Sequence, residues 1–418
     1  MPKNGMGRLF TVCRKEEPSL SQTTDRASFL ALGAAAFMVS ADARVIEPLL
    51  HVIADQFQTS VGDAAIVSSA YTLPYGLFQL VYGPLGDRIG KLRVMAMALV
   101  FFSVGTAACA FVPNLFLFAV LRFLTGMAAA AIIPLSLAYI GDKSTYETRQ
   151  ASLGKFMSAL MLGQILSVTI GGIFGQYISW RSIFILFGVI SLCVAALLWQ
   201  QSQIYPEAKK LDRKLGRDTL KPYGELLRSP ASRLVVIAVA IEGCLFFGGN
   251  VYVGSYLKDR FDLPYSWIGM ILTGVGIGGL CYSASVKKLV KKLGEVGLLL
   301  MGSLFLFVAF LGIAKLPDWK PIVPFIVLMG FGFYSMHSTL QTKATEMAPG
   351  ARGTAVSLFA FCLFVGQSFG VWALGRVKEG SGSYTTPFLI SAFGLLTLGL
   401  YLRYAFPRLS KPTAPPVA

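Results

Sequence analysis

The sequence predicts an all-α integral membrane protein whose twelve transmembrane helices form two pseudo-symmetric bundles of six. Three observations support this fold class: the chain is poor in charge, its apolar residues form long unbroken segments, and its two halves share residues at a constant offset. Of the 418 residues, 55% are apolar and 14% are charged, whereas soluble globular proteins carry about 25% charged residues. The mean hydropathy is +0.63. A soluble enzyme, a disordered chain and a disulfide scaffold are therefore disfavoured.

Twelve apolar segments follow one another along the chain. A transmembrane helix needs about 20 apolar residues, and each segment approaches or exceeds this length. The segments are unbroken rather than alternating, which disfavours a β-barrel. The predicted spans are 28–54, 63–84, 93–112, 115–140, 150–178, 181–199, 233–257, 265–286, 295–314, 321–342, 352–375 and 385–406.

The distribution of Lys and Arg predicts the orientation in the membrane. Because the number of spans is even, both termini lie on the same side. Of the 37 Lys and Arg residues, 27 lie in segments on the side of the termini and 7 lie in the opposite loops. Cytoplasmic loops carry such an excess, so we expect both termini in the cytoplasm and the protein in the inner or plasma membrane. The same bias explains the net charge of +16 without a nucleic-acid partner.

A polar and basic central loop separates two halves that look like repeats. The predicted parts are a cytoplasmic tail at 1–27, six-helix bundles at 28–199 and 233–406, a cytoplasmic loop at 200–232 and a cytoplasmic tail at 407–418. Several residues recur at an offset of 203 or 204. These pairs are Arg149 and Arg352, Gly163-Gln164 and Gly366-Gln367, and Gly90 and Gly294. Two repeated halves are typical of carriers that rock around a central site.

The loop after the second span carries the most specific motif of the chain. Gly83 predicts a close approach of two helices, and Gly90 permits a tight turn between spans. Asp87 places an anion where a helix N-terminus can receive it, and we expect that N-terminus in the span beginning at Arg352. Three basic residues anchor the loop at the cytoplasmic face. They are Arg88, Lys91 and Arg93. We predict that this loop is a conformational latch.

This loop resembles the signature GxxxDRxGRR of the major facilitator superfamily, with Lys91 at one of its terminal basic positions. Arg122 and Gly126 resemble the RxxxG motif of proton-linked members, in which the arginine is implicated in proton transfer. Gly171-Gly172 is similar to the end of span five in drug:proton antiporters. That branch has Gly-Pro where this chain has Ser167-Val168, which weakens the antiporter assignment. The resemblance covers nearly the whole chain and implies a twelve-helix transporter.

Ionisable residues inside the spans are the candidates for proton coupling, because a charge in the bilayer is costly and usually functional. Span one holds Asp42, Arg44 and Glu47, and the last two are three residues apart and can pair. Arg122 lies at a similar depth in span four, so either Glu47 or Asp42 can share it. Glu242 in span seven is a further acid. A structural role for the Arg44–Glu47 pair is the alternative.

Polar and aromatic residues in the spans are the candidates for a substrate cavity. They are Tyr71, Tyr75, Gln79, Gln164, Asn250 and Gln367. The first three lie on one face of span two, which suits an amphipathic or aromatic organic substrate, although helix packing through the tyrosines is the alternative. Gly248 and Gly249 predict a break in span seven, where carriers place binding groups. We interpret His337 as a packing residue.

These features predict a secondary transporter that exports small organic molecules by alternating access, coupled to protons, as in multidrug efflux. A metabolite symporter or facilitator, or a lysolipid carrier, is the alternative. The chain has no Walker loop and no HExxH, so no enzyme is predicted. The six cysteines form no CxxC pair, so no metal site or disulfide is expected. The expected partners are the substrate, protons and membrane lipid, with no cofactor, and the expected state is a monomer.

Overall fold

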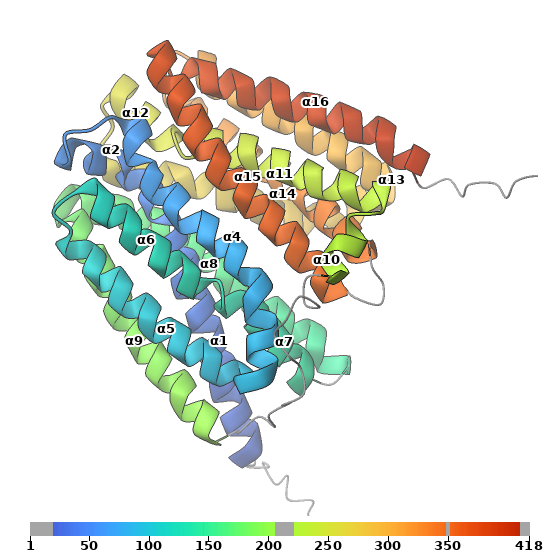
Figure 1. Ribbon diagram of the computed structural model, residues 1–418. Helices are drawn as coiled ribbons and strands as arrows, with labels where there is room; N and C mark the ends of the chain where they lie inside the picture. Colours follow the sequence, from blue (N-terminus) through green and yellow to red (C-terminus); the bar gives the residue numbers. More distant parts are fainter. Residues whose placement is uncertain (1–19, 145, 205–220, 348–351, 410–418) are drawn as a thin grey trace, which may run out of the picture.

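A computed structural model describes residues 20–144, 146–204, 221–347 and 352–409. Across these residues the chain is helical, without strands. The helices form two bundles, one from each half of the chain, which meet at the end where α2 and α12 lie and diverge away from it (Figure 1). We call this end the closed end. The arrangement agrees with the predicted all-α fold of two six-helix bundles.

The first half runs from α1 to α9. Its helices are α1 (Leu20–Arg44), α2 (Ile46–Gln56), α3 (Val61–Ala64), α4 (Ile66–Ile89), α5 (Lys91–Ala108), α6 (Leu115–Ala129), α7 (Ile132–Lys143), α8 (Tyr146–Tyr177) and α9 (Trp180–Ile204), with a short 3-10 helix at Cys109–Phe111. The second half contains α11 (Pro230–Asn250), α12 (Val253–Phe261), α13 (Tyr265–Lys315), α14 (Ile322–Glu346), α15 (Arg352–Ser381) and α16 (Thr385–Leu409).

The described helices account for twelve spans. Ten segments are long and apolar enough to cross a membrane, and α1 with α2 forms one more span that is bent by 45°. Helix α13 has 51 residues and a non-helical Gly294, so it contains two of the predicted spans. The φ angles of Gly90 and Gly294 are +105° and +66°, a region that favours glycine. The turn expected at Gly90 is therefore present, and the repeat places a second one at Gly294.

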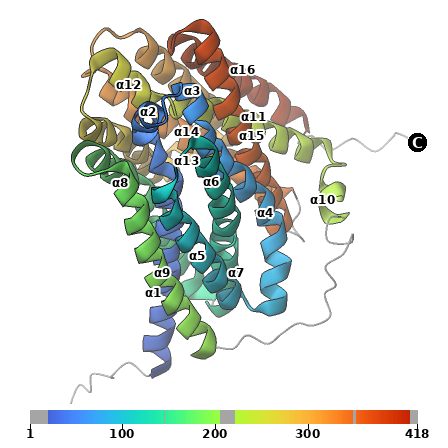
Figure 2. The same cartoon turned by 60° about the vertical axis from the view of Figure 1, so that its left-hand side comes forward.

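Several helix ends differ from the predicted ones. Helix α1 begins at Leu20 and α16 ends at Leu409, so both reach into the segments expected as tails. The segment expected as a loop at 200–232 contains the end of α9, the start of α11 and the short helix α10 (Lys221–Leu226). Hydropathy underestimates these ends because helices continue into polar surroundings beyond the apolar core. Residues 205–220 lie outside the described part of the chain, as do 1–19 and 410–418. Leu226 of α10 packs on α15, beside which α10 lies in Figure 2.

Close backbone contacts repeat between the two halves. A side chain added at Gly126 would overlap the carbonyl oxygen of Tyr71, and one at Gly330 would overlap that of Val275. Both residues of the second pair lie 204 positions after those of the first. In the same way Gly163 packs on the carbonyl of Phe37, and Gly366 on that of Ala240, at an offset of 203. Small residues let membrane helices approach closely, and here the same contacts build both bundles.

Polar contacts join the two halves at the closed end. Arg376 Nη2 lies 2.8 Å from Asp63 Oδ1, and the backbone N–H of Gly62 donates to Glu379 Oε1 at 3.0 Å. His51 Nδ1 lies 3.0 Å from Asp259 Oδ1. The same carboxylate accepts a hydrogen bond from the hydroxyl of Tyr384, and burial raises the pKa of this tyrosine above its ordinary value. These contacts hold the bundles together at this end.

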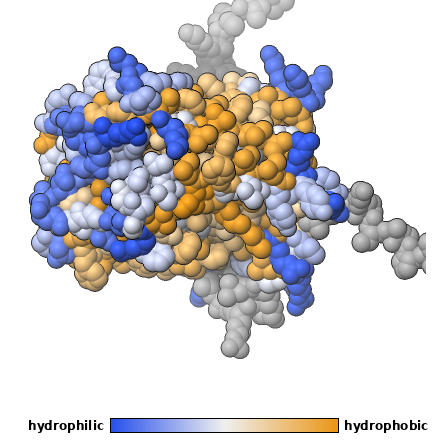
Figure 3. All heavy atoms as spheres, turned by 90° about the horizontal axis from the view of Figure 1, so that it is seen from above, coloured by the Kyte–Doolittle hydropathy of each residue, from blue (hydrophilic) through white to orange (hydrophobic). Residues whose placement is uncertain are grey.

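An apolar belt surrounds the molecule. Large apolar side chains such as Phe101, Phe116 and Trp372 are more than half exposed. In Figure 3 apolar atoms fill the middle of the view between polar ends. A contiguous apolar surface of this extent is typical of contact with lipid. The protein is therefore a multi-span membrane protein, and its belt lies between the closed end and the opposite end.

Candidate functional site

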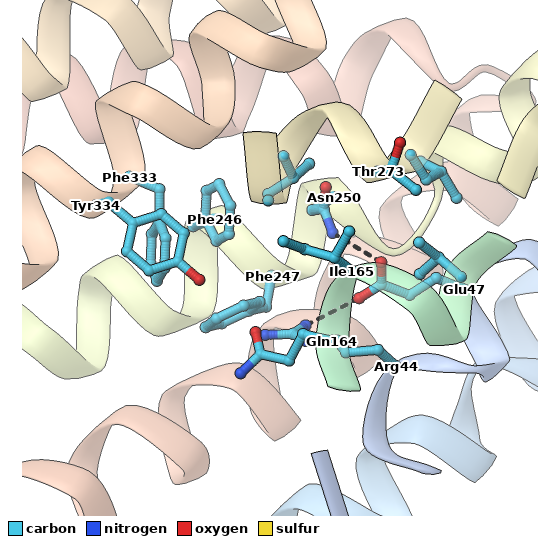
Figure 4. Close-up of a pocket in the computed structure, with 14 residues that line it drawn as sticks. Arg44, Glu47, Gln164, Ile165, Phe246, Phe247, Asn250, Thr273, Phe333 and Tyr334 are labelled. Atoms are coloured by element: carbon cyan, nitrogen blue, oxygen red, sulfur yellow. Dashed lines mark hydrogen bonds and ion pairs between the residues drawn. The ribbon is translucent and has the colours of Figure 1, made fainter. Parts of the chain in front are cut away.

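A small cavity lies between the two halves of the molecule. Its volume is about 40 Å³, and it is lined by residues of α1, α2 and α8 from the first half and of α11, α13 and α14 from the second. Figure 4 shows the side chains that surround it. The lining residues labelled there are Arg44, Glu47, Gln164, Ile165, Phe246, Phe247, Asn250, Thr273, Phe333 and Tyr334. One ion pair thus lies among aromatic rings.

Two contacts in this cavity join residues that the repeat relates. The guanidinium of Arg44 lies 4.4 Å from the centre of the Phe247 ring, and Asn250 Nδ2 donates to Glu47 Oε2 at 3.3 Å. In each pair the two residues are 203 positions apart. Equivalent residues of two repeats can touch only near the axis that relates the repeats. The cavity therefore lies at the pseudo-two-fold axis of the molecule.

Broken helices position these side chains. Arg44 is the last residue of α1 and Glu47 lies in the first turn of α2, with the 45° bend between them. A cation at a helix C-terminus and an anion at a helix N-terminus are both favourable. Asn250 is the last residue of α11, and the chain resumes as α12 at Val253. The interruption predicted after Gly248 and Gly249 is thus present at Val251 and Tyr252, but both residues keep right-handed helical angles and Pro230–Phe261 remains one span.

The ion pair expected within span one is formed. Arg44 Nη1 lies 2.8 Å from Glu47 Oε1. The side chains of Arg44 and Glu47 are 19% and 10% exposed, so the pair borders open space instead of being fully enclosed. The Oδ1 atom of Asn250 is buried and has no hydrogen-bond partner among the described residues. The cavity therefore contains a charged pair, and beside it the amide oxygen of Asn250 could accept a further hydrogen bond.

A second chamber adjoins the first. Its volume is about 80 Å³, and Arg44 and Gln164 line both chambers. Of the residues predicted for a substrate cavity, the second chamber contains Tyr71, Tyr75, Gln164 and Gln367, and the first contains Gln164 and Asn250. Gln79 is buried but lines neither chamber. The Tyr71 hydroxyl donates to the carbonyl of Val39 at 3.2 Å, so this side chain also ties α4 to α1.

Arg122 is paired with Asp42, and not with Glu47. Arg122 Nη1 lies 2.5 Å from Asp42 Oδ2, and both side chains are 0% exposed. The guanidinium also donates to the Asp42 carbonyl at 3.1 Å and lies 4.2 Å from the centre of the Tyr71 ring. A buried charge needs such partners, because desolvation is costly. Asp42 thus contacts Arg122 of α6, whereas Arg44 and Glu47 line the cavity.

A second buried acid has a partner that the sequence did not indicate. Glu242 is 0% exposed, and its Oε2 lies 3.0 Å from Nδ1 of His337. The His337 ring also stacks on Phe333, with centroids 5.1 Å apart. The interpretation of His337 as a packing residue therefore missed its contact with a carboxyl group. The two residues are 95 positions apart, and no local spacing could have paired them.

The structure corrects one residue of the motif loop. Among the described residues, a side chain added at Gly83 would meet nothing within 4 Å, so the close approach predicted there is not formed by this part of the chain. The tight packing occurs one turn later, at Gly86, where an added Cβ would overlap Leu135. Lys91 Nζ lies 3.5 Å from Asp87 and 2.8 Å from Asp142, and Arg88 is exposed. The N-terminus expected to receive Asp87 adjoins residues 348–351, which lie outside the described residues, so the latch stays a prediction.

Within the described ranges, no group of three His, Cys, Asp or Glu residues could hold a metal ion. The polar groups of the two chambers are one guanidinium, one carboxylate, amides and hydroxyls. Such a set could hold a small polar or charged molecule by hydrogen bonds and charge. Two buried acids, Asp42 and Glu242, contact Arg122 and His337 respectively.

Comparison with known proteins agrees with this architecture. The pattern of the Major Facilitator Superfamily matches residues 32–371. An uncharacterised transporter of this type from Bacillus subtilis, YceJ, is 27% identical over 379 residues, which cover 87% of this chain and 93% of YceJ. The multidrug efflux protein YfmO of the same organism is 26% identical over 366 residues, covering 85% and 88%.

A solved structure of a nucleoside transporter, a NupG variant, aligns with a TM-score of 0.76 at 13% identity, covering 92% of this chain and all of that one. Identity at this level supports the fold alone. The family match, in contrast, extends over most of the sequence and includes the motif loop, Arg122 and both halves. The chain is therefore a member of the Major Facilitator Superfamily of membrane transporters.

Proposed function

We propose that this protein exports a small organic molecule by alternating access, as a monomer driven by a proton gradient. The observation that carries the proposal is the contact between repeat-related residues at the axis, Glu47 with Asn250 and Arg44 with Phe247. Transporters built from repeats bind substrate where broken helices meet at the repeat interface. When the two bundles rock about such a site, it opens first to one side of the membrane and then to the other.

The orientation follows from the charge bias. We infer that both termini and the 200–232 segment are cytoplasmic, so the closed end faces the outside. The bundles then diverge toward the cytoplasm (Figure 1), and the conformation is open to the inside. Arg376–Asp63 and the neighbouring contacts of the closed end break when the transporter opens outward.

For proton coupling we favour Asp42, because it is the acid paired with Arg122. Protonation of Asp42 removes its charge and releases Arg122, whereas deprotonation restores the pair. A carrier that alternates between these two states can link proton movement to rocking. Glu47 and Glu242 are the other candidates, and the His337 contact of Glu242 supports it as the second acid to test.

The test uses the full chain in proteoliposomes. Uptake of ethidium, 1-naphthylacetate and 1-naphthylacetamide, chosen as cation, anion and neutral molecule, is measured with pH gradients of each sign. We expect uphill movement of at least one probe only when protons run the opposite way. Asp42→Asn should abolish accumulation and keep downhill exchange. Asp55→Asn, the same change on an exposed side chain of the same span, is the control.

Accumulation by Asp42→Asn at the rate of the unaltered protein would exclude Asp42 as the coupling acid, and Glu242→Gln would be tested next. If no probe moves against its gradient under either pH gradient while downhill flux occurs, the protein is a facilitator for these compounds. Movement of a probe with the proton gradient, instead of against it, would identify a symporter.

A lysolipid carrier is the second candidate, and one observation favours it. A groove of about 800 Å³ lies along α1 and α8, is lined mostly by apolar side chains and contains Lys155. An acyl chain with an anionic headgroup fits this combination. Transfer of fluorescent lysophosphatidylglycerol between the leaflets of proteoliposomes tests it, with Lys155→Gln expected to slow the transfer.

A further inference from the structure

We infer that the axial cavity recognises a carboxylate, that its substrates are organic anions with an aromatic or apolar body, and that Glu47 occupies the carboxylate position when substrate is absent. This inference rests on the proposed function, because it takes the cavity to be the transport site. It adds the chemical class of the substrate, which the fold and the family leave open.

The donors around Glu47 form a carboxylate-binding set. The carboxylate oxygen Oε1 accepts a hydrogen bond from Arg44 Nη1 at 2.8 Å, and Oε2 accepts one from Asn250 Nδ2 at 3.3 Å. The two donors come from opposite halves of the molecule (Figure 4). Donors that hold both oxygens of a carboxylate bind this group strongly when one of them is an arginine. A substrate carboxylate fits the same two donors.

Glu47 can leave this position because the pair is accessible. The side chains of Arg44 and Glu47 are 19% and 10% exposed, whereas Arg122 and Asp42 are both 0% exposed. Arg44 has a second support in the Phe247 ring, at 4.4 Å, so it keeps its place when Glu47 moves. A cavity of about 40 Å³ is smaller than the roughly 300–1,000 Å³ of organic ligand sites. Space for a substrate is therefore gained by displacing Glu47 and by moving the halves.

The surrounding rings determine the rest of the substrate. Phe246, Phe333 and Tyr334 line the same cavity (Figure 4), and Phe246 stacks on Phe333 with centroids 4.0 Å apart. Such walls favour an aromatic or apolar body. An organic cation fits less well, because Arg44 already covers the face of Phe247 and would repel a second positive charge.

The experiment compares three molecules of one shape. Purified full-length protein binds radiolabelled 1-naphthylacetate, and 1-naphthylacetamide and 1-naphthylethylamine compete as the neutral and cationic analogues. We expect the acid to bind at least about 10-fold more tightly than either analogue. Glu47→Gln removes the internal carboxylate that competes with the substrate. The acid should then bind at least about 10-fold more tightly than to the unaltered protein, because Arg44 and Asn250 are no longer occupied by Glu47 most of the time.

A double variant distinguishes loss of carboxylate recognition from misfolding caused by an unpaired charge. Arg44→Gln together with Glu47→Gln leaves no unpaired charge in the cavity, and it should lose the preference for the acid. Arg403→Gln, on an exposed residue of α16, is the matched arginine control and should bind as the unaltered protein does.

Tighter binding of the amine than of the acid would overturn the inference, as would an unchanged preference for the acid in the double variant. Weaker binding of the acid by Glu47→Gln would also contradict it. Binding to purified protein needs no gradient, so carboxylate binding without transport would refute the proposed function and leave this inference intact. Uphill transport of the amine without carboxylate binding would do the reverse.

Discussion

Gly126→Ala tests the packing that the two halves share. An added Cβ would overlap the carbonyl oxygen of Tyr71, so α6 and α4 must move apart or lose other contacts. Overpacking of this kind costs about 1–3 kcal/mol. Because the obstacle is backbone, which cannot turn aside like a flexible side chain, we expect about 3 kcal/mol. Alanine regains about 1 kcal/mol through helix propensity. The free energy of unfolding should therefore fall by about 2 kcal/mol.

The matched control lies in the same span. A Cβ added at Gly141 would meet nothing within 4 Å among the described residues, so Gly141→Ala keeps only the propensity gain and should stabilise by up to about 1 kcal/mol. Urea unfolding in detergent micelles, followed by helical circular dichroism, measures both variants. Gly330→Ala, at the equivalent position of the second half, should resemble Gly126→Ala. Equal stabilities of Gly126→Ala and Gly141→Ala would refute the reasoning.

Three further predictions concern orientation and conformation. A cysteine at Lys214, in a background without native cysteines, should resist external labelling in intact cells, and one at Asp318 should be labelled; the opposite pattern would reverse the topology. Asp87→Asn should shift the population toward the inward-open state, since a helix N-terminal interaction contributes about 0.3–2 kcal/mol; unchanged spin-label distances would refute the latch. Asp63→Arg should open the closed end by placing like charges together, and adding Arg376→Asp should restore closure because the pair is exposed and exchangeable. Distances measured across the closed end check this last pair, and failure of the second change to restore them would exclude a role for the ion pair.

Features that depend on neighbours along the chain could be predicted from the amino-acid sequence. Apolar segments indicate spans because lipid requires about 20 apolar residues in a row, whatever the rest of the fold does. Arg44 and Glu47 pair across three residues, a spacing that helix geometry brings together. The turn at Gly90 follows from the positive φ that glycine tolerates. The offset of 203 or 204 between recurring residues likewise predicted two repeated halves.

Contacts between residues far apart in the chain depend on how the helices pack in three dimensions. The sequence allowed either Asp42 or Glu47 to share Arg122, and the packing of the helices pairs Arg122 with Asp42. The contact between Glu242 and His337 required α11 and α14 to pack with particular faces together. Glu47 and Asn250 meet because a pseudo-two-fold axis passes between the two broken helices. Periodicity fixes the face of a helix on which a residue lies, but the direction of that face depends on the packing of all the other helices.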